Sequence, residues 1–63
     1  MKVYLERTKK LLELRATDGR DLLKQLRIPE AEAILVRNNE VVLPDEALRE
    51  TDDIQILSVV SGG

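Results

Sequence analysis

Apolar and polar side chains alternate along residues 1–15 with the period of half-buried β-strands. Residues 1–6 and 11–15 each form one such run, and the polar residues 7–10 between them are typical of a turn. The pattern therefore predicts a β-hairpin at the start of the sequence. The side chains expected to face the core are Val3, Leu5, Leu12 and Leu14.

A helical pattern replaces the alternation after Asp18. Asp18 is well suited to cap a helix, because its carboxylate can accept the free amide hydrogens of the first turn. The helix is expected to end before Pro29, whose ring disfavours helical geometry at the preceding residue. The pattern thus predicts a helix over about residues 19–26, with one apolar face formed by Leu22, Leu23 and Leu26.

The second half of the sequence returns to strand patterns. Residues 33–37 and 41–43 are apolar runs on either side of Asn38 and Asn39, which tolerate the positive φ angles of a tight turn. Residues 54–60 are apolar on both faces for most of their length, as is typical of a central strand. We expect this last strand to pair in parallel with the first one.

The order of these elements predicts an α+β fold. One main helix would lie across one face of a mixed sheet of four to five strands, and residues 44–48 would add a capped single helical turn. We interpret residues 1–63 as a single domain, because 63 residues have room for one core. The helix leucines are expected to pack against Val3, Leu5, Leu12, Leu14, Ile34, Val36, Ile54 and Ile56.

Composition removes most kinds of chemistry from consideration. There is no Cys and no His, so the usual nucleophile–base pairs cannot be built, and we expect neither a catalytic residue nor a metal site. The net charge of −2 combines eight basic and four acidic residues in 1–27 with two basic and eight acidic residues in 28–63. Tyr4 is the only aromatic residue, so the basic half lacks the stacking platforms of a nucleic-acid interface.

The sequence also predicts where the protein is located. No run of large apolar side chains is longer than three residues, so we expect no membrane segment and no signal-peptide core. Without an export signal, we expect a cytoplasmic protein with no direct nucleic-acid partner.

The sequence ends on two glycines that follow the predicted core strand. Ser61, Gly62 and Gly63 are expected to form a flexible tail (61–63) that can thread a narrow channel where any Cβ would clash. With this tail, the sequence resembles the ThiS/MoaD family of ubiquitin-like sulfur carriers, which have the β-grasp fold, and it is closest to the ThiS-like members. The resemblance rests on residues 1–26, AILVRNNEVVLP at 33–44, DDIQIL at 52–57 and VSGG at 60–63.

The resemblance implies a mechanism that needs no catalytic side chain from this protein. An ATP-dependent adenylyltransferase of the ThiF/MoeB type would adenylate the carboxylate of Gly63, and a persulfide sulfur would displace AMP to leave a thiocarboxylate. The sulfur would then reach the thiazole of thiamin, molybdopterin or a tRNA uridine, through an acceptor such as thiazole synthase or a tRNA thiolase. ATP and any zinc would belong to the activating enzyme, and this protein would be a carrier that binds no cofactor itself.

The alternation along the strands also predicts a surface for docking such a partner. If Ile54 and Ile56 face the helix, an outer apolar patch beside the tail would consist of Tyr4, Leu35, Leu57 and Val59. Two other functions stay open. One is a ubiquitin-like modifier joined to target lysines through Gly63, and the other is a ubiquitin-like interaction domain whose terminal glycines have no chemical role.

Overall fold

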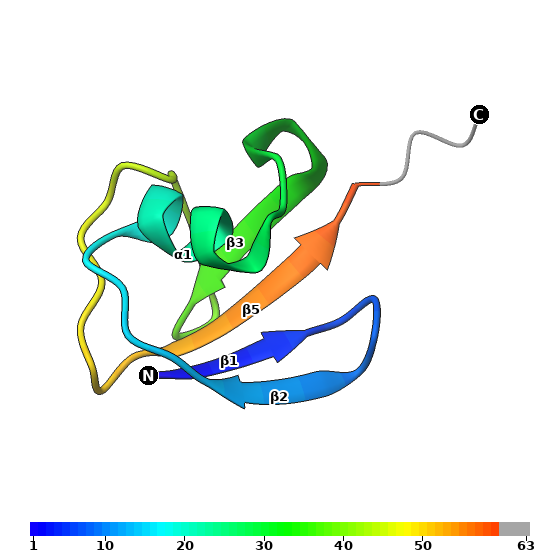
Figure 1. The fold of residues 1–63 in the computed structure, drawn as a ribbon. Coiled ribbons are helices and arrows are strands. Elements are labelled where there is room, and N and C mark those ends of the chain that lie inside the picture. The colour runs from blue at the N-terminus through cyan, green and yellow to red at the C-terminus, as the bar shows by residue number, and fades with distance from the viewer. Residues whose placement is uncertain (60–63) are drawn as a thin grey trace.

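Within residues 1–59, which the computed structural model describes, the strands form a mixed five-stranded sheet with a helix across one face (Figure 1). The strand order is β2-β1-β5-β3-β4, so β5 is central. It runs parallel to β1 and antiparallel to β3, which confirms the predicted α+β architecture and the parallel pairing of the last strand. The elements are β1 (Lys2–Leu5), β2 (Lys10–Glu13), α1 (Gly19–Leu26), the 3-10 helix η1 (Glu30–Glu32), β3 (Ala33–Arg37), β4 (Glu40–Val42) and β5 (Asp53–Ser58).

Helix α1 begins and ends where the sequence predicts. The Asp18 carboxylate accepts the N–H of Asp21 at 2.8 Å, which is the expected N-terminal cap. The first helical residue is Gly19, and it lies against β3 and the segment that follows β4. A Cβ at this position would collide with a methyl group of Leu35 and lie 3.0 Å from Cα of Pro44. The close approach of the helix start to the sheet therefore requires glycine here.

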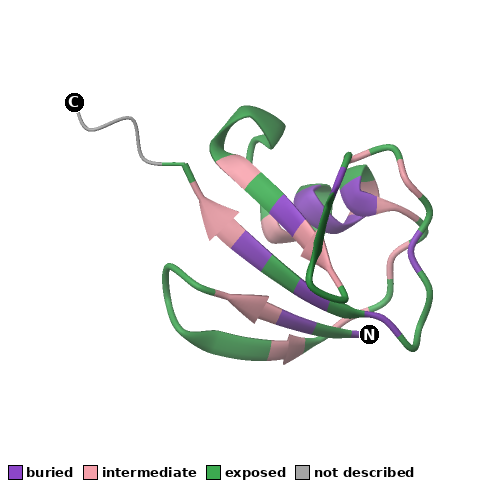
Figure 2. Ribbon diagram, turned by 180° about the vertical axis from the view of Figure 1, so that it is seen from behind, coloured by how far each residue is buried: buried purple, intermediate pink, exposed green. Residues whose placement is uncertain are grey.

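The core lies between α1 and the sheet. Buried and exposed residues alternate along β5, as expected for a strand with one covered face (Figure 2). Leu22, Leu23 and Val3 are the most completely buried large side chains, whereas Leu26 is half-buried at the edge of the core. The buried apolar residues are Met1, Val3, Leu22, Leu23, Leu35, Val42, Leu48, Ile54 and Ile56.

The prediction for β3 is wrong about which side chains face the helix. Leu35 lies opposite Ile56 of β5 and is only 2% exposed, so it belongs to the core and not to the outer patch. Ile34 and Val36, which were expected to pack against α1, point to the other side of the sheet because neighbouring residues of a strand face opposite ways. The strand is apolar at four consecutive positions, so only its pairing with β5 decides its orientation.

The single helical turn predicted for residues 44–48 is also wrong. The N–H of Glu46 donates to the carbonyl of Leu43 at 3.1 Å, and the Glu46 carboxylate accepts the N–H of Leu43 at 2.7 Å. These two bonds close a β-turn. The N–H of Leu48 then donates to the carbonyl of Thr17 at 3.0 Å, so the backbone pairs with the segment before α1 instead of with itself.

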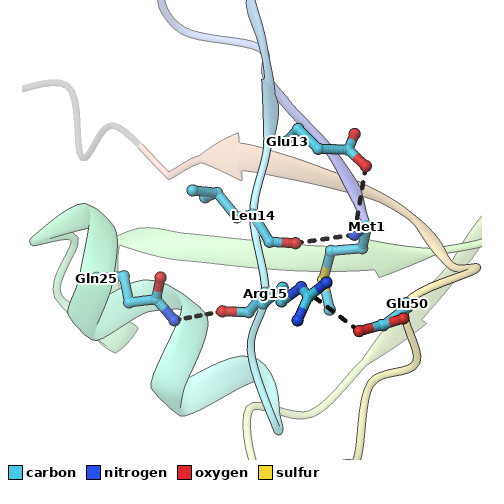
Figure 3. A network of polar contacts seen from close by, with 6 residues as sticks. All are labelled: Met1, Glu13, Leu14, Arg15, Gln25 and Glu50. Carbon is cyan, nitrogen blue, oxygen red and sulfur yellow. Dashed lines mark hydrogen bonds and ion pairs between the residues drawn. The ribbon is translucent and has the colours of Figure 1, made fainter.

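The connection between β2 and α1 is held by backbone carbonyls that accept hydrogen bonds from distant groups (Figure 3). The Met1 amino group donates to the carbonyl of Leu14 at 2.8 Å, and Nε2 of Gln25 donates to the carbonyl of Arg15 at 2.6 Å. Nε of Arg15 lies 3.5 Å from the Glu50 carboxylate, but both side chains are exposed, so this ion pair adds little stability. The Met1 contact ties the start of the chain to the end of β2, and the Gln25 contact ties the last turn of α1 to the connection.

The turn between β3 and β4 is tied to the start of β5. Asn38 and Asn39 have φ angles of 50° and 70°, which confirms the predicted tight turn. The Asn38 side chain also donates to the Asp52 carboxylate at 3.1 Å and accepts the N–H of Asp53 at 3.0 Å. The second oxygen of Asp52 accepts the N–H of Arg49 at 2.8 Å. Asp52 thus joins the hairpin to the loop that leads into the central strand.

These hydrogen bonds make Asp52 a contributor to acid sensitivity. The Arg49 N–H, and after it the Asn38 amide, hold the pKa of Asp52 below its ordinary value, although burial acts in the opposite direction. The stabilisation is therefore present above the unfolded-state pKa of about 3.9 and is lost as the pH falls through the lower pKa of the folded state. We expect the free energy of unfolding, measured by urea titration, to decrease over that acid range.

The matched variant is Asp52→Asn, which keeps the shape but cannot accept both hydrogen bonds. It should lower the free energy of unfolding at neutral pH by about 1–3 kcal/mol, because either the N–H of Arg49 or the side-chain amide of Asn38 loses its acceptor. Its unfolding free energy should also depend less on pH than that of the wild type in the acid range. Parallel pH profiles for the two proteins would show that Asp52 is not the responsible group.

Candidate functional site

The candidate site is built around the end of the central strand. β5 is paired with β1 up to Ile56 and with β3 up to its last residue, Ser58. Immediately afterwards the N–H of Val59 donates to the carbonyl of Glu32 at 2.9 Å. Glu32 belongs to η1, a short element that the sequence pattern does not predict. The chain is thus anchored at Val59, one residue beyond the sheet and two residues before the predicted tail begins in the sequence. The tail residues Ser61, Gly62 and Gly63 lie outside the described residues.

The face of the sheet that points away from α1, here called the open face, has an apolar surface. Val3 and Leu5 lie on the core side, so Tyr4 between them lies on the open face. The pairing registers place a row of five side chains across the strands on this face, formed by Leu11, Tyr4, Gln55, Val36 and Val41. Four of the five are apolar or aromatic, which is unusual for a sheet face exposed to solvent.

A second pair of apolar side chains lies nearer to the end of β5. Ile34 is directly opposite Leu57 in the antiparallel pairing of β3 with β5, two residues beyond the Val36–Gln55 pair. Ile34 is 38% exposed and Leu57 is half-buried. Because Leu57 immediately precedes the last residue of β5, this pair is the part of the open face closest along the chain to the tail.

The predicted docking residues are therefore placed as follows. Tyr4 and Leu57 lie on the open face. Leu35 lies in the core, and the β3 residue on the open face beside Leu57 is Ile34. Val59 is 48% exposed but follows the last residue of β5, so the strand register does not assign it to the open face. Because β3 is apolar on both sides, the sequence alone does not show which of Ile34 and Leu35 faces the core. The pairing of β3 with β5 does.

A groove opens on the other side of the sheet at the same end of β5. It lies between the turn that joins β1 to β2, the residues after α1 and the end of β5, and we call it the exit groove. Sequence reasoning did not find it, because its walls come from three segments that are distant along the chain. Its apolar lining consists of Leu5, Leu26, Ile28, Pro29, Ile56 and Val59.

Within residues 1–59, the charged groups form structural contacts and no recognisable catalytic constellation. No cluster of three or more carboxylates suited to a metal ion occurs there. Arg20 donates from Nε to the Glu30 carboxylate at 2.9 Å, and this contact raises the pKa of the guanidinium above its ordinary value. No helix in the described part is long and apolar enough to cross a membrane.

The architecture defines the class of protein. A helix that crosses a mixed five-stranded sheet, with the central last strand parallel to the first, is the β-grasp fold of ubiquitin-like proteins. The model of the ThiS family matches residues 3–63, so the chain belongs to the ThiS family of ubiquitin-like sulfur carriers. No curated protein matches the sequence. Membership implies interaction with an adenylyltransferase and with sulfur-accepting enzymes in general.

Proposed function

We propose that this protein carries sulfur as a thiocarboxylate on Gly63. The observation that supports the proposal most strongly is that the family match extends over the β-grasp core and through residue 63. The anchoring of Val59 to Glu32 gives any tail that follows it a defined starting point on a rigid sheet. We propose the thiazole of thiamin as the destination of the sulfur, with molybdopterin and tRNA uridine as the other acceptors that this chemistry serves.

The proposed reaction begins with activation of a poor electrophile. An oxygen of the Gly63 carboxylate attacks the α-phosphate of ATP on a ThiF/MoeB-like adenylyltransferase, and pyrophosphate leaves. The terminal sulfur of a persulfide on a partner then attacks the acyl carbon, and AMP leaves. A thiol next attacks the other sulfur of the resulting acyl disulfide, forming a disulfide and releasing the thiocarboxylate. The protein provides the carboxylate and the docking surface, while ATP and any zinc belong to the activating enzyme.

The proposal is tested on protein isolated from its native host. Intact-mass analysis should reveal a species heavier by the difference between one sulfur and one oxygen, and this species should be missing from a variant without Gly62 and Gly63. The purified wild type should also support ATP–pyrophosphate exchange by the adenylyltransferase of that host, whereas the shortened variant should not. Conjugates of higher mass would identify a protein modifier, and equal exchange by both proteins would contradict any role of the terminal glycines.

We further propose that the open face docks the adenylyltransferase. Replacing Ile34 by aspartate should raise the KM for the carrier in pyrophosphate exchange about tenfold, because a charge would enter an apolar contact near the tail. The free energy of unfolding should change little, since position 34 is exposed enough for the carboxylate of the new aspartate to stay hydrated.

Leu11→Asp is the matched control for this variant. Leu11 is 65% exposed on the same face, but it lies on the edge strand β2, which is separated from β5 by β1. A KM that rises only for Ile34→Asp assigns the contact to the region around β3 and β5. If neither variant alters the KM, the open face does not dock this enzyme.

A further inference from the structure

The exit groove has a composition that differs from that of the open face. Arg7, in the turn between β1 and β2, and Arg27, directly after α1, line it together with Glu32. Two basic residues and one acidic residue therefore surround its apolar floor. Among residues 1–59, the ion pairs are Met1–Glu13, Arg15–Glu50 and Arg20–Glu30, so neither groove arginine is paired there.

Arg27 occupies a backbone position that ordinarily favours glycine. Its φ and ψ angles of 58° and 39° are left-handed, and it caps α1 by donating its N–H to the carbonyl of Lys24 at 3.1 Å. Most helices that end in this way use glycine at the left-handed residue, because a Cβ there costs about 1–2 kcal/mol. Strained residues of this kind cluster at binding sites, where the side chain has a use that offsets the cost. Arg27 is one of the residues that line the exit groove.

We propose that the exit groove is a second docking site, which binds an extended segment of the adenylyltransferase in which aliphatic side chains are flanked by carboxylates. The inference rests on the proposed function, because it assigns the groove to the enzyme that receives the tail. The aliphatic side chains occupy the floor around Ile28 and Ile56, and the carboxylates pair with Arg7 and Arg27.

Two features of the groove identify this occupant. The first is charge, since two arginines that form no ion pair with residues 1–59 lie beside an apolar floor and complement an acidic and aliphatic segment. The second is position, since Val59 lines the groove and is also the anchored residue from which the tail departs. An enzyme that receives the tail must approach this end of β5 and meets the groove as it does so.

The first experiment probes the groove without the enzyme. The isotope-labelled protein is titrated with acetyl-Asp-Leu-Leu-Asp-amide and, as a control, with acetyl-Lys-Leu-Leu-Lys-amide, while the backbone amide shifts are followed by NMR. The acidic peptide should shift the amides of Ile28, Ser58 and Val59, and should leave those of Val36 and Gln55 on the open face unchanged. The basic peptide should produce no shift at the groove.

Charge-reversal variants assign the effect to the arginines. The double variant Arg7→Glu with Arg27→Glu should lose the response to the acidic peptide. Lys24→Glu is the matched control, because it makes the same charge change on the last turn of α1 without lining the groove. Equal responses of the double variant and the wild type would overturn the proposal, as would shifts of the groove amides that depend only on protein concentration, which would identify a second copy as the occupant.

The second experiment uses the adenylyltransferase. The double variant should raise the KM in pyrophosphate exchange about tenfold with little change in kcat, and the effect should shrink at high salt, because two solvated ion pairs are lost. Lys24→Glu should behave like the wild type. An unchanged KM for the double variant would overturn the groove proposal while leaving the carrier function in place. If the wild type itself fails to support exchange, the carrier function is contradicted, and the groove is then judged by the peptide titration alone.

Discussion

Replacing Leu22 by alanine is expected to lower the free energy of unfolding by about 2–5 kcal/mol, the usual range for a large buried aliphatic side chain. Leu22 is fully buried in the centre of the single layer of side chains between α1 and the sheet. A domain of this size has a total stability on the order of 3–9 kcal/mol, so the substitution should remove a large share of it. Urea denaturation followed by circular dichroism measures the loss.

Leu26→Ala is the matched control on the same helix. Leu26 is half-buried and packs only against the margin of the core, so it removes less apolar surface from water and its truncation should cost clearly less. Similar losses for the two variants would show that α1 is not oriented with Leu22 toward the sheet.

Adding one residue after Gly63 is expected to abolish sulfur loading. In the proposed mechanism the reacting atom is the carboxylate of Gly63, and an extra residue moves the carboxylate by about 3.3–3.6 Å along an extended chain. Displacements of about 1 Å already reduce reaction rates about a hundredfold when reacting atoms must be aligned. The measurement is ATP–pyrophosphate exchange, with formation of the thiocarboxylate followed by intact mass.

Gly63→Ala tests the same site without changing its length. The added methyl group restricts the backbone and widens the chain, so the rate of exchange should fall steeply. Unfolding free energies of both variants should stay within about 0.5 kcal/mol of the wild type, because neither change alters a residue of the core, and such a result would exclude misfolding as the cause. Undiminished exchange by the extended protein would refute Gly63 as the reactive residue.

Local sequence patterns are sufficient to predict most elements of the fold. The spacing of three leucines and the capping residue Asp18 determine α1, because both act within the helix itself. In the same way, the two asparagines at 38–39 predict the turn between β3 and β4, and the apolar run at 54–60 predicts β5. In each of these cases the signal depends on neighbours within a few positions along the chain, and no other segment competes with it.

Tertiary pairing decided the features that the sequence did not reveal. Either face of β3 could have been buried, and the alignment of Leu35 with Ile56 selected one. The segment around Glu46 has the composition of a helix start, but the hydrogen bond from Leu48 to Thr17 favours a turn instead. The same dependence on distant partners explains why the exit groove could not be predicted, and why Tyr4 and Leu57 lie on the open face as expected whereas Leu35 lies in the core.

The hydrogen bond from Val59 to Glu32 also sets a limit on distance. Four residues follow Val59 in the sequence, and covalent geometry allows them to reach at most about 14 Å even when fully extended. Because the bond fixes Val59 on η1, the distance that Gly63 can reach is measured from that residue. Any enzyme that acts on Gly63 must bring its reaction centre within that distance of Val59, so this backbone contact sets an upper limit on the depth of the partner's channel.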